Sequence, residues 1–444
     1  MPEQNRPDHR LHASITTKDD KVEGVLCEIY LPKKVTDPVG LFFLPTTEQS
    51  HLLDHVFEFS FHGEIKDVSG KVRKIIKAER VYHTKSSTRY WDPELSEIVM
   101  VGEPANLRII DLLNEEGQAD KSNDILEGTF WLTPNAMLSP MYSRTLSFTG
   151  NVTIEKVRNF EFTLSNGLHL TFSHHYRYLD NENGETVSFP ELVAEFKIGR
   201  EEGEVGSLLQ GVDDFLMLAS FSARQSCVCL GWDSYDPSKV VKYFRRDVAI
   251  PKPKKDHSMH DGLIEVTDFA EFISTAYNSF VGIERKDLVR QAIHRAIGRG
   301  DGTLESNYLI LYSALETLVL FCRQEFTNEL ILGQLNRVPF RTAFDSFCRH
   351  FDIDVIDLWP VVDRKDGVSL ADVRNKLIHG DSFNPLQERA LISAKEQLRW
   401  VVERSVLSVL GWQVPKSKVS KEYLSKMTMY KEWREDRKIL SEST

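Results

Sequence analysis

The spacing of apolar residues changes about halfway along the chain, and this change restricts the fold more than any other feature. From about residue 22 to 200 apolar side chains recur at every second position, as at Phe57, Phe59 and Phe61, which is typical of a strand with one buried face. Beyond about residue 262 they recur every three or four positions, which is typical of a helix with one buried side. The sequence therefore predicts an α+β chain, with a mainly antiparallel β part followed by an all-α part.

A hairpin is the clearest element of the β part. Apolar residues alternate over 160–164 and again over 168–172, with Asn166 and Gly167 between them. An Asn-Gly pair between two alternating strands favours a tight turn, because both turn positions need positive φ. Residues with helical spacing then follow at Leu208, Val212, Phe215, Leu216 and Ala219. We expect a sandwich or barrel with one covering helix.

The length of 444 residues is too great for one ordinary core and indicates more than one domain. Residues 251–257, PKPKKDH, combine prolines and charges without an apolar side chain, which is typical of a surface linker. We therefore expect a β-rich sensor or regulatory domain over 1–250, a linker over 251–262 and a helical domain over 263–414. Residues 415–444, dense in charge, are expected to form a solvated helix or a disordered tail.

Composition limits the location and the partners of the chain. The most apolar stretch, residues 308–321, is too short to cross a bilayer, and residues 1–6 lack the apolar core of a secretory signal. Five cysteines, an odd number, argue against a disulfide framework. We expect a cytoplasmic protein without membrane contact. The formal net charge of −11 means that any RNA contact must come from a local basic patch.

Residues 374–380, RNKLIHG, are predicted to lie in a short helix with marked ends. Ser369 followed by Asp372 favours a capping box at its start, and Gly380 favours its end. Asn384, Pro385 and Gln387 predict the start of the last long helix. The motif therefore lies between two marked helix boundaries.

Three side chains of this motif suit RNA cleavage without a metal ion. The imidazole of His379 could take the proton from a ribose 2′-hydroxyl or protonate the departing 5′-oxygen. The guanidinium of Arg374 could hold two phosphate oxygens as negative charge develops on them. Asn375 lies four residues before His379, on the same helical face, and could orient the imidazole or the phosphate.

The motif and its helical setting resemble the Arg-x4–6-His signature of HEPN domains, including the polar residue after the arginine. The bundle resemblance covers about 262–414, and the whole chain looks like the ApeA-like HEPN proteins of bacterial antiphage defence. That resemblance implies an endoribonuclease with Arg374, Asn375 and His379 as catalytic residues, no cofactor and no metal. It also implies an abortive-infection role, an RNA substrate such as tRNA or mRNA, and a phage-derived trigger at the β-rich domain.

Arg374 and His379 are five residues apart, and so about 140° apart around a regular helix. One protomer therefore does not readily present both side chains to one substrate. HEPN ribonucleases pair two copies of the motif across a dimer interface, and the resemblance thus implies a symmetric homodimer.

Other interpretations of the motif stay open. The segment could be a surface helix with an incidental arginine and a histidine that favours its C-terminal end. The bundle could be a noncatalytic HEPN-like module for dimerisation or nucleotide binding, with the β-rich domain as the ligand-binding part. A metal-dependent nuclease is a third possibility, which loss of activity in EDTA would reveal.

Weaker candidates lie elsewhere in the helical part. Lys286, Arg290, His294 and Arg295 could present a basic stripe to RNA, although a solvated helix face is as good an interpretation. Glu316 interrupts the most apolar helix and could reach Arg374 or His379, as a supporting residue or as a structural ion pair.

A metal site is less favoured than core packing for the cysteines and histidines of the β-rich part. Cys227 and Cys229 do not have a specific zinc spacing, and the adjacent His174 and His175 point to opposite faces of a strand. Small buried thiols are the better interpretation. Aromatic residues such as Trp131 and Trp232 are likewise expected in the core.

Overall fold

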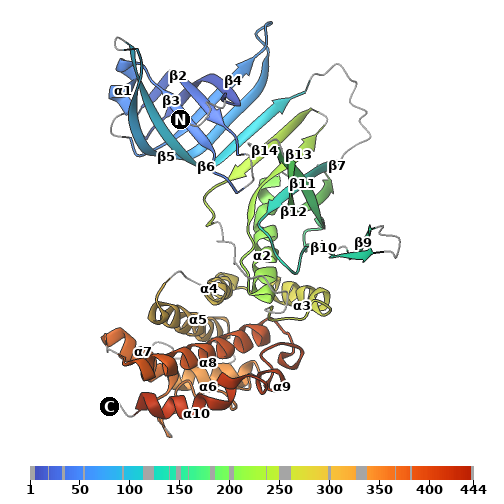
Figure 1. Cartoon of the computed structure of the whole chain (residues 1–444), viewed down its shortest axis with the longest axis vertical. Coiled ribbons are helices and arrows are strands. Elements are labelled where there is room, and N and C mark those ends of the chain that lie inside the picture. The colour runs from blue at the N-terminus through green and yellow to red at the C-terminus, as the bar shows by residue number, and fades with distance from the viewer. Residues whose placement is uncertain are drawn as a thin grey trace. The chain divides into compact units, whose positions relative to one another are not determined.

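The computed structural model of the chain is shown in Figure 1. It describes residues 6–18, 20–32, 36–53, 56–92, 95–113, 125–139, 141–146, 152–158, 160–180, 186–199, 205–236, 238–249, 262–298, 302–326, 338–365, 367–380 and 383–441.

The first part of the described chain is mainly strands. These are β1 (His9–Thr16), β2 (Lys21–Tyr30), β3 (Gly40–Leu44), β4 (Glu58–Lys66), β5 (Val72–Asp92), β6 (Leu95–Leu112), β7 (Ile125–Leu132), β8 (Met141–Leu146), β9 (Val152–Arg158), β10 (Phe160–Thr163), β11 (His169–Asp180), β12 (Thr186–Gly199), β13 (Cys229–Asp236) and β14 (Lys239–Arg245). Two helices occur among them, α1 (Thr47–Leu53) and α2 (Val205–Ala223).

The second part of the described chain is helical. Its α-helices are α3 (Phe269–Val281), α4 (Lys286–Ile297), α5 (Leu304–Glu325), α6 (Phe340–His350), α7 (Leu370–His379), α8 (Pro385–Val409), α9 (Lys421–Leu424) and α10 (Thr428–Ser441), with the 3-10 turn η4 (Val414–Lys416). Among the described helices, none is both long and apolar enough to cross a membrane.

Six strands close into an antiparallel barrel. The pairs β1–β2, β2–β3, β3–β6, β6–β5, β5–β4 and β4–β1 form a complete circle. Alternate residues of the strands point inward: Ile15, Cys27 and Phe43 are fully buried, while Ser14, Leu26 and Phe42 before them are partly exposed. The predicted α+β class and its barrel-like antiparallel part are confirmed.

The sheet continues beyond the barrel through β6, which also pairs with β14. The strand order from there is β14, β13, β7, β12, β11 and β10, all antiparallel. The predicted hairpin is present, because β10 pairs with β11, but of the two turn positions only Gly167 adopts positive φ, at +84°, and Asn166 does not. A local turn signal thus fixed the register of this pair.

The chain divides into two compact units, and the division falls within α2. One unit comprises residues 1–134, 139–212 and 228–253, and the other comprises 135–138, 213–227 and 254–444. The expected covering helix is therefore shared between the units instead of belonging to the β-rich part alone. The linker expected at 251–262 lies, except for residue 262, outside the described residues.

Helix α8 is the centre of the helical unit. It packs against α4, α5, α7 and α10 (Figure 1). Its buried charges are paired: Glu403 binds Arg224, and Arg404 donates to both oxygens of Asp357 at 2.6 and 2.8 Å. A buried charge without a partner would cost several kcal/mol, so these pairs fix which segments lie against α8.

The segment expected to be a solvated or disordered tail is instead an integral part of the helical unit. Helix α10 packs on α8, with Trp433 stacked on Trp359 at 6.2 Å and a buried hydrogen bond from Ser393 to Asp436. Arg437 donates to the carbonyl oxygens of Asp363, Gly367 and Val368 at 2.8 to 3.0 Å. The sequence did not predict this packing because the segment is mostly charged and its buried apolar residues, such as Trp433 and Leu440, are few. Asp436 and Arg437 are buried because they bind residues far away in the sequence.

Replacing Arg437 tests how strongly α10 holds the loop before α7. Arg437→Ala would remove a buried guanidinium and leave three partly buried carbonyl oxygens without their donor, and we expect a loss of about 3 kcal/mol in the free energy of unfolding. Urea unfolding followed by circular dichroism measures it. Lys438→Ala, at an exposed site of the same helix, should change the value by less than about 0.5 kcal/mol. Equal effects of the two variants would contradict the role of Arg437.

Candidate functional site

The motif helix α7 begins and ends at the predicted residues. Ser369 and Asp372 form a complete capping box: the Ser369 hydroxyl accepts from the Asp372 backbone at 3.2 Å, and the Asp372 carboxylate accepts from the Ser369 backbone at 2.9 Å. Gly380 ends the helix in the left-handed conformation, with φ +77°. The predicted capping box of Asn384 and Gln387 likewise starts α8.

Contacts on both sides hold α7 in place. The buried hydroxyl of Tyr308 on α5 donates to the carbonyl of Leu370 at 2.7 Å, at the first turn. The ammonium of Lys376 donates to the carbonyl of Leu440 on α10 at 3.0 Å. Leu370 and Val373 are buried beneath the helix. The direction in which α7 presents its polar side chains is therefore fixed by α5 and α10.

Arg374 extends over α5. Its guanidinium lies 5.8 Å from the ring centre of Tyr312, 3.6 Å from a carboxylate oxygen of Glu316, and donates to the Asn375 side-chain oxygen at 3.2 Å. The expectation that Glu316 reaches Arg374 thus agrees with the geometry. About a third of the Arg374 side chain is exposed, so its charge remains accessible to a ligand.

Arg374 and Asn375 line an open pocket of about 710 Å³. Four segments form it: α5, the first turn of α6, the loop over 362–365, and α7. Its charged lining residues are the cations Arg341, Arg364, Lys365 and Arg374 and the carboxylates Glu316 and Asp363. The pocket is therefore locally cationic in a chain whose formal net charge is −11, and this favours an anionic ligand.

Two groups at the pocket have shifted pKa values. Burial of the Tyr312 hydroxyl raises its pKa strongly, and the charge of Glu316 adds to the rise while Arg374 opposes it, so this phenol stays protonated. Partial burial of Asp372 favours its neutral form, but hydrogen bonds from Ser369 and Arg364 outweigh that effect and lower its pKa. The capping carboxylate is therefore ionised near neutral pH.

His379 lies apart from this pocket. It is the last residue of α7, its side chain is exposed, and it is not among the residues that line the pocket. In the described part of the chain no hydrogen bond joins it to Asn375, whose side-chain oxygen accepts from Arg374 instead. The structure thus brings Arg374, Asn375 and Glu316 together, whereas His379, five positions after Arg374 and four after Asn375, lies outside the pocket.

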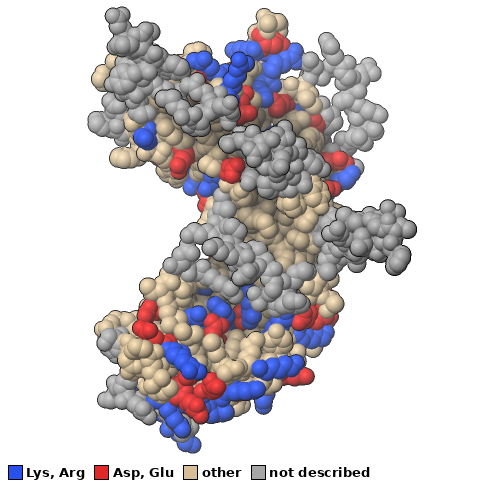
Figure 2. All heavy atoms as spheres, viewed as in Figure 1, with Lys and Arg blue, Asp and Glu red and all other residues tan. Residues whose placement is uncertain are grey.

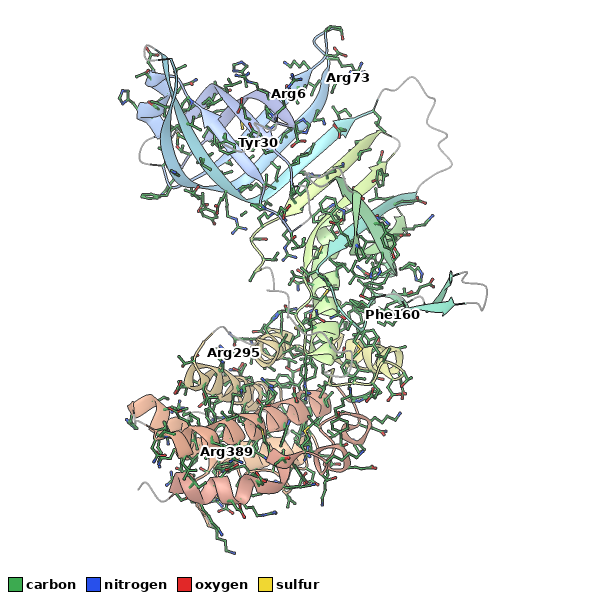
Figure 3. All side chains as sticks on the ribbon, viewed as in Figure 1. Arg6, Tyr30, Arg73, Phe160, Arg295 and Arg389 are labelled. Carbon is green, nitrogen blue, oxygen red and sulfur yellow. The ribbon has the colours of Figure 1, made fainter. Side chains whose placement is uncertain are left out.

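Most of the positively charged side chains of α4 form hydrogen bonds or ion pairs with other residues of the protein. Arg290 binds the buried Asp214 at 2.7 and 2.9 Å. Arg295, which Figure 3 labels, donates to the hydroxyl of Thr317 at 2.6 Å. Partial burial, and then the charge of Arg290, lower the pKa of His294. Lys286 is left partly exposed at the start of the helix.

These contacts weaken the case for an RNA-binding stripe on α4. Figure 2 shows Lys and Arg interspersed with Asp and Glu on the visible face of the helical unit, so this face carries no field of one sign.

The cysteines and histidines considered for a metal site do not form one cluster. Cys227 and Cys229 are buried, and the ring of His175 lies 3.2 Å from a carboxylate oxygen of Glu195 at the surface. Among the described residues, no group of three His, Cys, Asp or Glu side chains is placed to hold a metal ion. Trp131 is partly buried and Trp232 is buried, as expected of core residues.

Among the pocket residues that the sequence did not indicate are Phe340, Arg341, Arg364 and Lys365. They lie 9 to 34 positions before Arg374 in segments without a motif. The run Asp363-Arg364-Lys365 just before the capped helix was the one available signal, since cations there lie near the start of α7.

Comparison with known proteins identifies no relative: no family model matches the chain, and neither a curated protein nor a solved structure is significantly similar to it.

The shifted pKa of Asp372 predicts how the cap of α7 responds to pH. Because the folded-state pKa is lowered, the stability that this carboxylate contributes is complete above its ordinary value of about 4 and is lost as the pH falls through the lower folded value. Asp372→Ala should therefore destabilise the protein by about 1 kcal/mol at pH 7 and by progressively less below pH 4. Urea unfolding of both proteins between pH 7 and 3 measures this, and a pH-independent difference would contradict it.

Proposed function

We propose that the chain is a metal-independent endoribonuclease of the HEPN type, with Arg374, Asn375 and His379 as its catalytic residues. The observation that carries this proposal is the position of Arg374 in a pocket with three further cations, while His379 ends the same helix at the surface. A phosphodiester backbone supplies the negative charge that such a pocket favours.

The chemistry uses the ribose as its own nucleophile. One imidazole removes the 2′-hydroxyl proton as the oxygen attacks the adjacent phosphorus, and a second, protonated imidazole gives a proton to the departing 5′-oxygen. Arg374 stabilises the charge that gathers on the nonbridging phosphate oxygens. The products are a 2′,3′-cyclic phosphate and a 5′-hydroxyl, and the histidines exchange their protonation states.

Separate acid and base groups require two copies of His379, and we infer a symmetric homodimer whose site combines two motifs. Two exposed apolar side chains close to His379 in the sequence support this: Ile378, its neighbour, is 52% exposed, and Leu386, seven positions later, is 58% exposed. Apolar side chains beside a polar catalytic residue suit an interface between copies of the chain.

A noncatalytic function is the second candidate, and the contact of Glu316 with Arg374 is the observation that favours it. In that case the arginine would serve only to link α7 to α5. The two groups are 3.6 Å apart with side chains 34% and 42% exposed, so the pair contributes about 1 kcal/mol or less. A phosphate can displace a contact this weak, and we therefore favour catalysis.

The biological role that we propose follows from the resemblance to ApeA-like proteins. Cleavage of host or phage RNA, tRNA or mRNA, would stop phage growth in an abortive infection in the cytoplasm. The β-rich part would sense a phage-derived trigger, because unrestrained cleavage would harm the host.

Cleavage in a chelator tests the assignment. Purified protein with EDTA should cut single-stranded RNA and leave 2′,3′-cyclic phosphate ends. His379→Ala and Arg374→Ala should each lower the rate by at least about 100-fold, because each removes a group that acts in the transition state. Labelled RNA resolved on a denaturing gel measures the rate.

Arg349→Ala is the matched control, since Arg349 is an exposed arginine of α6 outside the pocket. It should cleave at the wild-type rate, and all variants should retain the wild-type circular dichroism and mass in solution. Equal residual cleavage by wild type and His379→Ala would refute the catalytic role, and loss of activity in EDTA would indicate a metal nuclease.

A further inference from the structure

Three cations, Arg341, Arg364 and Lys365, reach the Arg374 pocket from segments outside the motif. Arg341 lies in the first turn of α6, and Lys365 lies in the loop before α7. Both are exposed, and within the described part of the chain no ion pair or side-chain hydrogen bond occupies either charge. Arg364 differs, because its guanidinium binds Asp372 at 2.5 and 3.1 Å. Among the described residues, Arg341 and Lys365 are therefore the cations of the pocket lining that form no ion pair within the protein and can bind a ligand.

An aromatic ring adjoins these charges. Phe340 also lines the pocket, is only partly buried, and packs with its ring centre 5.8 Å from that of Tyr312 and 6.1 Å from that of Phe344. The two neighbouring rings hold Phe340 in position. A positioned aromatic ring next to unpaired cations is the combination that binds an unpaired nucleotide, with its base stacked and its phosphate neutralised.

We propose that Phe340, Arg341 and Lys365 form a subsite for the nucleotide next to the scissile phosphate. Arg341 and Lys365 bind its phosphate, and Phe340 stacks on its base. The pocket of about 710 Å³ is within the range of sites for ligands of this size. The inference rests on the proposed ribonuclease function and extends it to how the substrate is held.

The subsite implies a preference for unpaired RNA. A base that pairs within a duplex has its faces covered by its neighbours and does not stack on Phe340 without leaving the helix. The two cations would still attract the phosphates of a duplex. Phe340 thus contributes only to the binding of single-stranded RNA, whereas Arg341 and Lys365 contribute to the binding of both single-stranded and duplex RNA.

Binding to a catalytically inactive chain tests the subsite separately from cleavage. The full-length His379→Ala protein is titrated in EDTA against a fluorescein-labelled single-stranded RNA of ten nucleotides and against a duplex of the same length. Adding Arg341→Ala and Lys365→Ala should weaken single-strand binding about tenfold and lower the slope of log affinity against log salt by about 1.4. Phe340→Leu should weaken single-strand binding about tenfold and leave duplex binding unchanged.

Arg349→Ala in the same background is the control, and it should bind both RNAs as the parent does. Unfolding midpoints show whether the Phe340→Leu variant still folds. If that variant does not fold, the double variant at the exposed Arg341 and Lys365 still tests the subsite. Binding by the double variant that equals the control, or no binding by the parent, would overturn the subsite. If wild type fails to cleave while binding depends on these residues, the ribonuclease proposal fails, and the three residues remain a subsite for a nucleotide of bound RNA without a scissile phosphate beside it.

Discussion

The buried charges of α8 are the constraint on which the helical unit depends. Glu403 and Arg404 lie at 3% and 2% exposure, and charges so deep in a protein must be paired. Arg404 is satisfied by Asp357 and by the carbonyl of Val419, and the hydroxyl of Tyr430 donates to the same Asp357, whose pKa it helps to lower. One ion pair thus joins α8 to the loop before α7 and to the C-terminal segment.

The packing of the helical unit also sets the directions in which α7 presents Arg374 and His379. Because α7 is held on one side by α5 and on the other by α10, Arg374 and His379 keep the angular separation that their spacing gives them. Arg374 faces a cationic pocket built by its own chain, whereas His379 ends the helix beside exposed Ile378. We therefore propose that a single chain presents half of the site and that a second copy supplies the other half.

Features set by neighbouring residues were predictable from the sequence, and features set by distant ones were not. The caps of α7 and α8 and the turn at Gly167 depend on side chains within four positions, so their residue types suffice. The burial of Trp433 depends on Trp359, and the pocket brings Arg341 to Arg374 from 33 positions away. Such contacts have no local signal, and the charged C-terminal segment was misinterpreted for this reason.

The central claim is that two chains share one catalytic site. Wild type and His379→Ala can be co-expressed with different tags and the mixed dimer, which holds one His379, purified through both. The account predicts that this dimer cleaves RNA at least about 100-fold more slowly than wild type, because acid and base come from different chains. A mixed dimer with about half the wild-type activity would show that each chain works alone, and would contradict the shared site.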